Sequence, residues 1–386
     1  MQSVRYLSLD ALRGFAILGM IVDHSAAYFP IDPGDDEGIF EVLDARVFVL
    51  VMGLSAGITL ARAAQRPRIA YVKTWLRRAV LIILLGVLLS LHFSGVPVVL
   101  ENLGLTMVLA TPFLFLRTRW LVTAIVAWLV VGPIVRLPIE LLLAGPDSPA
   151  VWMAYSPLQL LLLSEDYLVL GYVPVLLLGV LLHRIQFGRL APTFVMLGAG
   201  LVLAVISLTV LRPLETAAGW TGFWTWSAAG LATAAAVGLW GVTTLAFDLA
   251  PFRVRLWAAK LGRPLIDIGM LSLSVYTLHV LLLTPLWVAA LHFGWQGIEV
   301  GVSDRLYPLW RDWESPYAWW ILIGVLVVCV PFALIWNRTL GPGPVERLLG
   351  VASLRHPPSY LTVVAPVPPA SSTVEPRPGE VVSGGQ

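Results

Sequence analysis

Charge is scarce in this sequence. Charged residues make up 12% of the 386 residues, whereas they make up roughly a quarter of an ordinary soluble domain. Hydrophobic residues make up 58% of the chain, so its charged side chains are too few to cover its surface in water. The net charge is only +2 and the basic residues are spread over many loops, which argues against a nucleic-acid partner.

Cysteine is almost absent as well. Cys329 is the single cysteine and lies within an apolar run. The chain can therefore form neither an internal disulfide nor a cysteine-based zinc cluster. From this we expect no metal site, and the functional chemistry has to come from other side chains.

Long apolar runs are what the sequence has in abundance. A helix needs about 20 apolar residues to cross a bilayer, and backbone groups in lipid must be paired within their own segment. Such windows fall at 7–29, 43–61, 75–93, 97–116, 119–137, 167–184, 193–211, 227–247, 265–290 and 318–337. The sequence therefore predicts an all-α integral membrane protein, a bundle of about ten transmembrane helices. A shorter run at 151–163 is expected to form an interfacial or re-entrant helix.

The chain has 16 tryptophans, and several stand at the ends of the apolar runs. An amphipathic indole ring suits the boundary between lipid tails and headgroups. We therefore expect the two edges of the membrane to be marked by Trp75, Trp120, Trp152, Trp257, Trp319 and Trp320.

Basic residues gather in alternate loops of the ten-span count. The clusters are Arg62, Arg66, Arg68, Lys73, Arg77 and Arg78; Arg117 and Arg119; Arg184 and Arg189; Arg253, Arg255, Lys260 and Arg263; and Arg338, Arg347 and Arg355. Cytoplasmic loops of membrane proteins carry an excess of lysine and arginine. Both ends of the chain are therefore predicted to lie in the cytoplasm.

The last part of the chain differs in composition from the rest. From about residue 357 it is rich in proline, serine and valine and has no helical period, which is typical of disorder. We expect one transmembrane domain over residues 1–350 and a disordered cytoplasmic tail over residues 351–386.

The first apolar run, LSLDALRGFAILGMIVDHSAAYF, contains ionisable residues. On a helix, Asp10, Arg13 and His24 share one face, and Asp10 and Arg13 are close enough to pair. Ionisable groups at membrane depth are costly and favour a functional interpretation. The alternative is an Asp10–Arg13 ion pair at the cytoplasmic end with His24 at the outer interface, because both ends of this helix are close to water.

Two other groups of polar residues stand out. In the late run IDIGMLSLSVYTLHVLLL, Ser272, Tyr276 and His279 share a face and Ser274 points away from it. Such a row fits either a site or ordinary hydrogen bonding between membrane helices. Arg77 and Arg78, at the start of the third span, fit either cytoplasmic anchoring or a site for an anionic ligand. Gly53 and Gly57 of the second span have a spacing that favours close helix packing.

These motifs resemble the transmembrane acyltransferase superfamily. The opening SLDALRG, followed by ten residues between Arg13 and His24, is similar to the first helix of its acyltransferase-3 members. VFVLVMGLSAGI, YVKTWLRRAVLIILLG and LSLSVYTLHVLLL resemble the second, third and a late helix of the same family. The tail LIWNRTLGPGPVERLLG is closer to a related branch of uncharacterised bacterial membrane proteins, often grouped with heparan-alpha-glucosaminide N-acetyltransferase. The resemblance covers about residues 5–350.

The resemblance implies a function. His24 and Arg13 would be catalytic, with Asp10, Ser272, Tyr276 and His279 supporting them, while Arg77 and Arg78 would bind acyl-CoA. Acyl-CoA would serve as a co-substrate reached from the cytoplasm, with no permanently bound cofactor, and the acceptor would be a hydroxyl or amine of an envelope glycan or lipid. A neutral imidazole can take a proton from such an acceptor, and arginines can bind phosphates in bidentate fashion.

The sequence therefore predicts an integral membrane acyltransferase in a bacterial cytoplasmic membrane. The alternative is a multi-pass transporter, in which the polar face of the first helix lines a transport pathway. The two hypotheses differ on His24, which the enzyme needs for acyl transfer and which then has to face a cavity that opens to the cytoplasmic side past Arg13.

Overall fold

The computed structural model describes residues 6–25, 39–63, 67–91, 98–143, 169–185, 189–217, 226–292 and 317–352. Every regular element within these ranges is a helix, as the apolar runs predict. The run at 151–163 and the tail beyond residue 352 lie outside the described residues. The expected interfacial helix and the expected disordered tail therefore stay predictions.

The helices follow the predicted windows closely in most places. In the first half of the chain they are α1 (Leu7–Ser25), α2 (Ile39–Arg62), α3 (Arg68–Leu91), α4 (Leu100–Ala110), the 3₁₀-helix η1 (Thr111–Phe115) and α5 (Thr118–Leu143). In the second half they are α8 (Val169–Arg184), α9 (Leu190–Ile206), the π-helix η2 (Ser207–Leu211), α10 (Arg212–Ala217), α11 (Trp226–Thr244), the π-helix η3 (Leu245–Leu249), α12 (Phe252–Leu261), α13 (Arg263–Met270), α14 (Ser272–His292), α15 (Tyr317–Thr339) and α16 (Pro344–Ala352).

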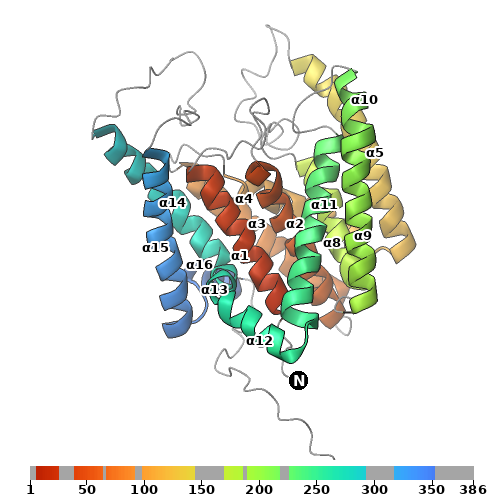
Figure 1. The fold of residues 1–386 in the computed structure, drawn as a ribbon. Coiled ribbons are helices and arrows are strands. Elements are labelled where there is room, and N and C mark those ends of the chain that lie inside the picture. Colours follow the sequence, from red (N-terminus) through yellow and green to blue (C-terminus); the bar gives the residue numbers. More distant parts are fainter. Residues whose placement is uncertain are drawn as a thin grey trace, which may run out of the picture.

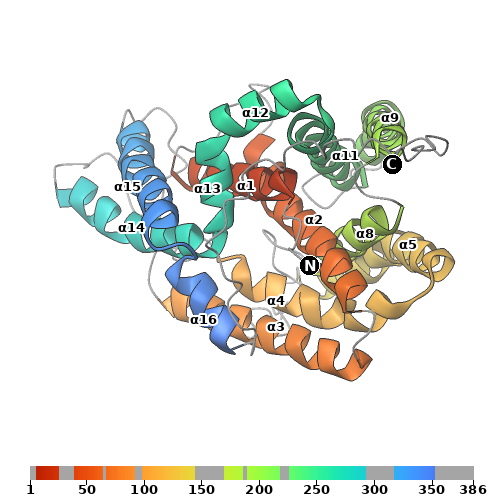
Figure 2. The same cartoon turned by 90° about the horizontal axis from the view of Figure 1, so that it is seen from below.

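Helices α1 and α2 form the centre of the bundle, and the other helices surround them (Figures 1 and 2). α1 packs against α2, α11, α13, α14 and α15, while α2 packs most extensively against α8. α3 and α4 pair on one side, and α9 covers α11 on another. The first helix is therefore enclosed by elements from both halves of the chain.

Glycine allows the closest of these contacts. A Cβ atom added to Gly53 on α2 would lie 2.0 Å from the carbonyl oxygen of Leu176 on α8, and one added to Gly57 would lie 2.7 Å from Cβ of His183. Both values are below ordinary van der Waals contact, so the two helices approach each other only because these positions have no side chain. The predicted packing role of Gly53 and Gly57 is confirmed.

The outer surface of the bundle is apolar. Helix α9, for example, buries only Thr193 and Gly200, and most of its large apolar side chains are exposed, among them Phe194, Val195 and Leu201. A helix that is apolar all round and exposed is suited to lipid rather than water. Five described helical segments are long and apolar enough to cross a membrane, and the bent pair α13–α14 would make a sixth. Shorter apolar helices lie at Leu100–Phe115, Thr118–Val131 and Gly171–Arg184.

The predicted span at 265–290 is wrong as a single straight helix. It is divided at Leu271 into α13 and α14, whose axes differ by 86°. The break leaves amide groups without partners at the start of α14, and in lipid such groups need another acceptor. A carboxylate from α16 supplies that acceptor, as described below, so the bend is satisfied by tertiary structure.

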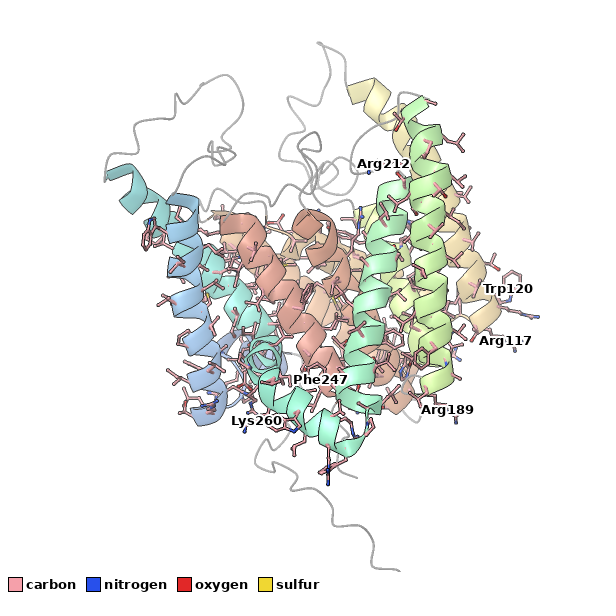
Figure 3. All side chains as sticks on the ribbon, viewed as in Figure 1. Arg117, Trp120, Arg189, Arg212, Phe247 and Lys260 are labelled. Carbon is pink, nitrogen blue, oxygen red and sulfur yellow. The ribbon has the colours of Figure 1, made fainter. Side chains whose placement is uncertain are left out.

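The labelled side chains of Figure 3 show where basic residues gather. Arg117, Arg189 and Lys260 lie toward the lower end of the bundle, where α1 begins, and Arg212 lies near the upper end. Residues of three of the five predicted basic clusters thus lie toward the same end, and Arg212 is a basic residue at the other. The assignment of the lower end to the cytoplasm follows from the positive-inside rule and stays a prediction.

Trp152 and the side chain of Trp319 lie outside the described residues, and the placement of the tryptophans at the membrane edges stays a prediction. Trp120, Trp257 and Trp320 are exposed on the surface. Trp75 is instead buried between α3 and α4, where its indole Nε1–H donates a hydrogen bond of 2.9 Å to the carbonyl oxygen of Met107. The burial of Trp75 could not be predicted, because position within an apolar run does not tell which face of the helix a neighbour covers.

Candidate functional site

The polar face of α1 points into the bundle. Asp10 and His24 are buried, and Arg13 is partly buried. The Arg13 guanidinium donates to Oδ1 of Asp10 at 3.1 Å and to the hydroxyl of Ser55 on α2. The predicted Asp10–Arg13 pair is therefore formed, and Ser55 extends it to the second helix.

The start of α1 also contacts the π-helix η3. The hydroxyl of Ser8 donates a short hydrogen bond to Oδ2 of Asp248, the acidic residue near the end of η3. The α1 end that carries Asp10 and Arg13 is thus bound by polar contacts to both α2 and η3. π-helical segments of this kind are frequent at functional sites.

His24 lies at the opposite end of α1 and contacts His279 of α14. Nδ1 of His24 lies 3.1 Å from Nε2 of His279, and the two rings are stacked with their centroids 5.3 Å apart. His24 is 3% exposed and His279 is fully buried. His24 therefore faces the protein interior and not lipid, and the predicted cavity that opens from it toward the cytoplasmic side stays a prediction.

Tyr276 completes this group. Its ring meets the His279 ring edge to face, with centroids 5.0 Å apart. Its hydroxyl oxygen accepts a hydrogen bond of 3.2 Å from the amide of Val99, just before α4. The predicted pairing of Tyr276 and His279 on one helix face is confirmed, and the structure adds that this face meets α1 and α4.

Ser272 and Ser274 lie at the start of α14, about a turn and a half or more before His279. Ser272 is buried at the bend. Ser274 points away from the Tyr276–His279 face, as the helical period predicts, and its hydroxyl donates to Oε2 of Glu346 on α16. Of the predicted row, His279 is therefore brought to His24 and Tyr276 packs on His279, while Ser272 remains at the break in the helix.

Glu346 is a structural residue that the sequence analysis did not single out. Its Oε1 accepts hydrogen bonds from the amides of Leu273 at 2.8 Å and Ser274 at 3.1 Å. These amides belong to the first turn of α14, where a carboxylate is favoured by both the open N–H groups and the helix dipole. In the sequence, Glu346 ends the motif Gly-Pro-Gly-Pro-Val-Glu, and in the structure this motif places Glu346 at the break between α13 and α14.

A second residue missed from the sequence is Asp267 on α13. It is fully buried, pairs with Nε of Arg263 at 2.9 Å, and accepts a hydrogen bond of 2.5 Å from Asn337 on α15. An ionisable residue inside a predicted span could have been recognised by the same rule that identified Asp10. It holds α13 against α15 and so supports the helix that packs on α1.

Helices α1 and α13 touch through their backbones. A Cβ atom added to Gly14 would lie 1.9 Å from the carbonyl oxygen of Leu265, and one added to Gly269 would lie 1.7 Å from the carbonyl oxygen of Asp10. The two glycines are therefore required for this crossing. The crossing lies beside Asp10 and Arg13, so it determines where their helix sits.

Arg77 and Arg78 lie on α3, nine and ten residues after its first residue, Arg68. Arg77 is exposed and Arg78 is partly buried. Helix α3 packs against α4 and also touches α14 and α16. The two arginines are therefore carried by a helix that touches the His279 helix, and their role in binding a ligand stays a prediction.

The arrangement allows proton transfer without a metal. Two buried imidazoles in contact can hold and exchange a proton, and a neutral imidazole is the most common general base in enzymes. Within the described ranges, no group of three or more histidine, cysteine, aspartate or glutamate side chains is placed to hold a metal ion. The chemistry that these residues themselves can perform is acid–base chemistry.

Comparison with models of protein families gives a match. The sequence model of a family described as "Acyltransferase domain" matches residues 6–336. This range includes α1 with Arg13 and His24, α3 with Arg77 and Arg78, and α14 with Tyr276 and His279. No curated protein matches the chain.

Proposed function

Because the family match spans well over half of its length, this chain belongs to the acyltransferase-3 family, and from that premise we propose that it transfers an acyl group from acyl-CoA to a hydroxyl or amine acceptor. Family membership and the apolar helices make it a multi-pass membrane acyltransferase in general terms. The donor, the acceptor and the roles of individual residues belong to the proposal. The observation that carries it is His24, buried on the polar face of α1 where the family's first-helix histidine falls.

In the proposed reaction, His24 acts as the general base. It takes the proton from the acceptor O–H or N–H as that atom bonds to the thioester carbonyl carbon. The C–S bond then breaks, and the CoA sulfur leaves with the proton that His24 returns. The products are the acylated acceptor and CoA with a free thiol, so protons and electrons balance without any further reactant.

Arg13, Arg77 and Arg78 are proposed to hold the donor. Guanidinium groups bind phosphates through paired, charge-assisted hydrogen bonds, and all three arginines belong to the end of the bundle predicted to face the cytoplasm. Arg13 and His24 are eleven residues apart, which is about 16 Å along α1 at 1.5 Å per residue. The long flexible arm of CoA is suited to such a distance, since it connects the nucleotide phosphates to the thioester.

The acceptor is proposed to approach from the other side. His24 lies in the last turn of α1, away from the basic end, so a hydroxyl or amine of an envelope glycan or lipid would meet the thioester there. The host membrane is proposed to be a bacterial cytoplasmic membrane. Membership of an acyltransferase family favours this enzyme over the alternative of a transporter.

The decisive experiment measures donor binding and thioester cleavage separately. The full chain, purified in lipid nanodiscs, is titrated with radiolabelled acetyl-CoA, and release of CoA thiol is followed with and without a mixture of envelope glycans. The variant His24→Ala is expected to bind acetyl-CoA as the wild type does and to release thiol about 10²–10⁴-fold more slowly. His183→Ala, at the end of α8, is the matched control and is expected to match the wild type.

Failure of the wild type to bind acetyl-CoA would overturn the proposal, as would normal thiol release by His24→Ala. The arginines are tested in the same assay with Arg77→Ala and Arg78→Ala, against Arg212→Ala at the other end of the bundle. Loss of one charge-assisted contact of about 1.5–3 kcal/mol predicts weaker binding by roughly one to two orders of magnitude for the α3 variants only. Equal binding by all three variants would remove Arg77 and Arg78 from the donor site.

A further inference from the structure

The contact between His24 and His279 joins two helices from opposite ends of the chain. Nδ1 of His24 and Nε2 of His279 are 3.1 Å apart, which is within hydrogen-bond distance. The two residues are 255 positions apart in sequence. A hydrogen bond between two imidazole nitrogens requires an N–H on one ring and a lone pair on the other. The pair therefore shares one bridging proton. The ring that donates this proton determines which nitrogen of His24 carries the lone pair that can act as a base.

The contact geometry allows one placement if His24 is the base. Nδ1 of His24 faces Nε2 of His279, so the proposed base has to use its other ring nitrogen, Nε2. A neutral imidazole carries a proton on one ring nitrogen and a lone pair on the other, so a basic Nε2 requires the proton of His24 on Nδ1. That N–H can donate to His279 only if Nε2 of His279 presents its lone pair, which leaves the proton of neutral His279 on Nδ1.

We infer that His279 is the positioning residue of the general base His24: it accepts the His24 Nδ1–H, keeps Nε2 as the basic nitrogen, and shares the positive charge when Nε2 takes a proton. This inference rests on the proposed acyltransferase function. In the step itself, the acceptor proton moves to Nε2 of His24 while the acceptor atom bonds to the acyl carbon. The CoA sulfur later removes that proton, and the bridging proton stays between the two rings throughout.

A second histidine suits this role in a membrane interior better than a carboxylate does. A resting carboxylate would be a buried charge, which costs several kcal/mol in a low-dielectric site unless it is paired. Neutral imidazole carries no such cost and still offers a strong acceptor. The carboxylate on the same helix, Asp10, is bound to Arg13 near the other end of α1, about 14 residues and 21 Å away along the helix.

Tyr276 explains why the His279 ring keeps its orientation. The tyrosine ring lies edge to face against the His279 ring, and the Val99 amide holds its hydroxyl. Edge-to-face aromatic pairs are worth about 0.5–1.5 kcal/mol beyond the area they bury. The ring of His279 is thus held from α4 through Tyr276 while its Nε2 faces α1.

The test compares two substitutions of similar size at one position. The side-chain oxygen of His279→Gln can reach the position of Nε2 and accept the His24 Nδ1–H, whereas His279→Leu has no acceptor. In the nanodisc assay, His279→Leu is expected to lower kcat for thiol release by about 10²-fold or more, with KM for acetyl-CoA unchanged. His279→Gln is expected to retain kcat within about tenfold of the wild type. His183→Gln serves as the control for a histidine-to-glutamine change elsewhere.

The outcomes separate this inference from the proposed function. Wild-type activity that depends on His24 but survives His279→Leu would overturn the positioning role and leave the acyltransferase proposal standing. Equal loss of kcat in both His279 variants, with acetyl-CoA binding retained, would also overturn it, because an acceptor atom would then not matter. If His279→Leu does not fold, His279→Asn takes its place. Its amide is one methylene too short to reach Nε2, so kcat close to that of His279→Gln would refute the inference.

Discussion

Substitution of Gly269 by alanine tests the packing on which the candidate site depends. Gly269 lies on α13 where that helix crosses α1, and an added Cβ would lie 1.7 Å from the carbonyl oxygen of Asp10. That is half of the 3.4 Å at which ordinary contact begins. The same Cβ would lie 2.8 Å from the amide nitrogen of Gly14. Both opposing atoms are backbone, so no side chain can rotate away and the helices themselves have to separate.

The size of the effect follows from two opposing terms. Overpacking a tightly packed core costs typically 1–3 kcal/mol, and a clash with backbone on both sides belongs at the upper end, about 3 kcal/mol. Replacement of glycine by alanine within a helix returns about 1 kcal/mol through helix propensity. The expected net loss in the free energy of unfolding is therefore about 2 kcal/mol. Because the displaced helix carries Asp10 and Arg13, acetyl-CoA binding should fall as well.

The assay is reversible unfolding by sodium dodecyl sulfate in mixed micelles, followed by tryptophan fluorescence, together with acetyl-CoA binding. Gly198→Ala on α9 is the matched control, because an added Cβ there meets nothing within 4 Å. The control should be as stable as the wild type or slightly more stable. If Gly269→Ala unfolds at the same detergent concentration as Gly198→Ala, the close α1–α13 crossing and the site geometry built on it are refuted.

Substitutions at two further residues test contacts between helices. Glu346→Gln keeps an acceptor for the Leu273 and Ser274 amides but removes the charge at the start of α14, so the free energy of unfolding is expected to fall by about 1 kcal/mol. Glu346→Ala removes the acceptor as well and should lower it by up to about 2 kcal/mol. Equal melting temperatures of both variants and the wild type would contradict the capping role. Trp75→Phe removes the indole donor to the Met107 carbonyl and is expected to cost about 1 kcal/mol, measured by the same detergent titration. Trp120→Phe, at an exposed position, is its control, and an equal effect of the two changes would show that the buried hydrogen bond contributes nothing.

Much of the helical content could be predicted from local sequence. Apolar runs of sufficient length predicted most helices within a few residues, because a segment in lipid has to pair its own backbone groups. The helical period also placed Tyr276 and His279 on one face and Ser274 on another. The bend at Leu271 could not be predicted in this way. The acceptor for the amides at the bend is Glu346, more than 70 residues later, and a local window contains no information about it.

The scarcity of charge, the long apolar runs and the polar face of α1 were determined by the sequence alone, because hydropathy and helical period are local properties. They were sufficient to identify a membrane protein and to single out Arg13 and His24, while the acyltransferase family was indicated by the resemblance of the helix motifs. Only the tertiary structure decided that His24 meets His279, that Arg13 meets Ser55, and that Gly14 and Gly269 allow α1 and α13 to touch. Those contacts depend on which helices become neighbours, and that outcome follows from packing over the whole bundle and not from any single segment.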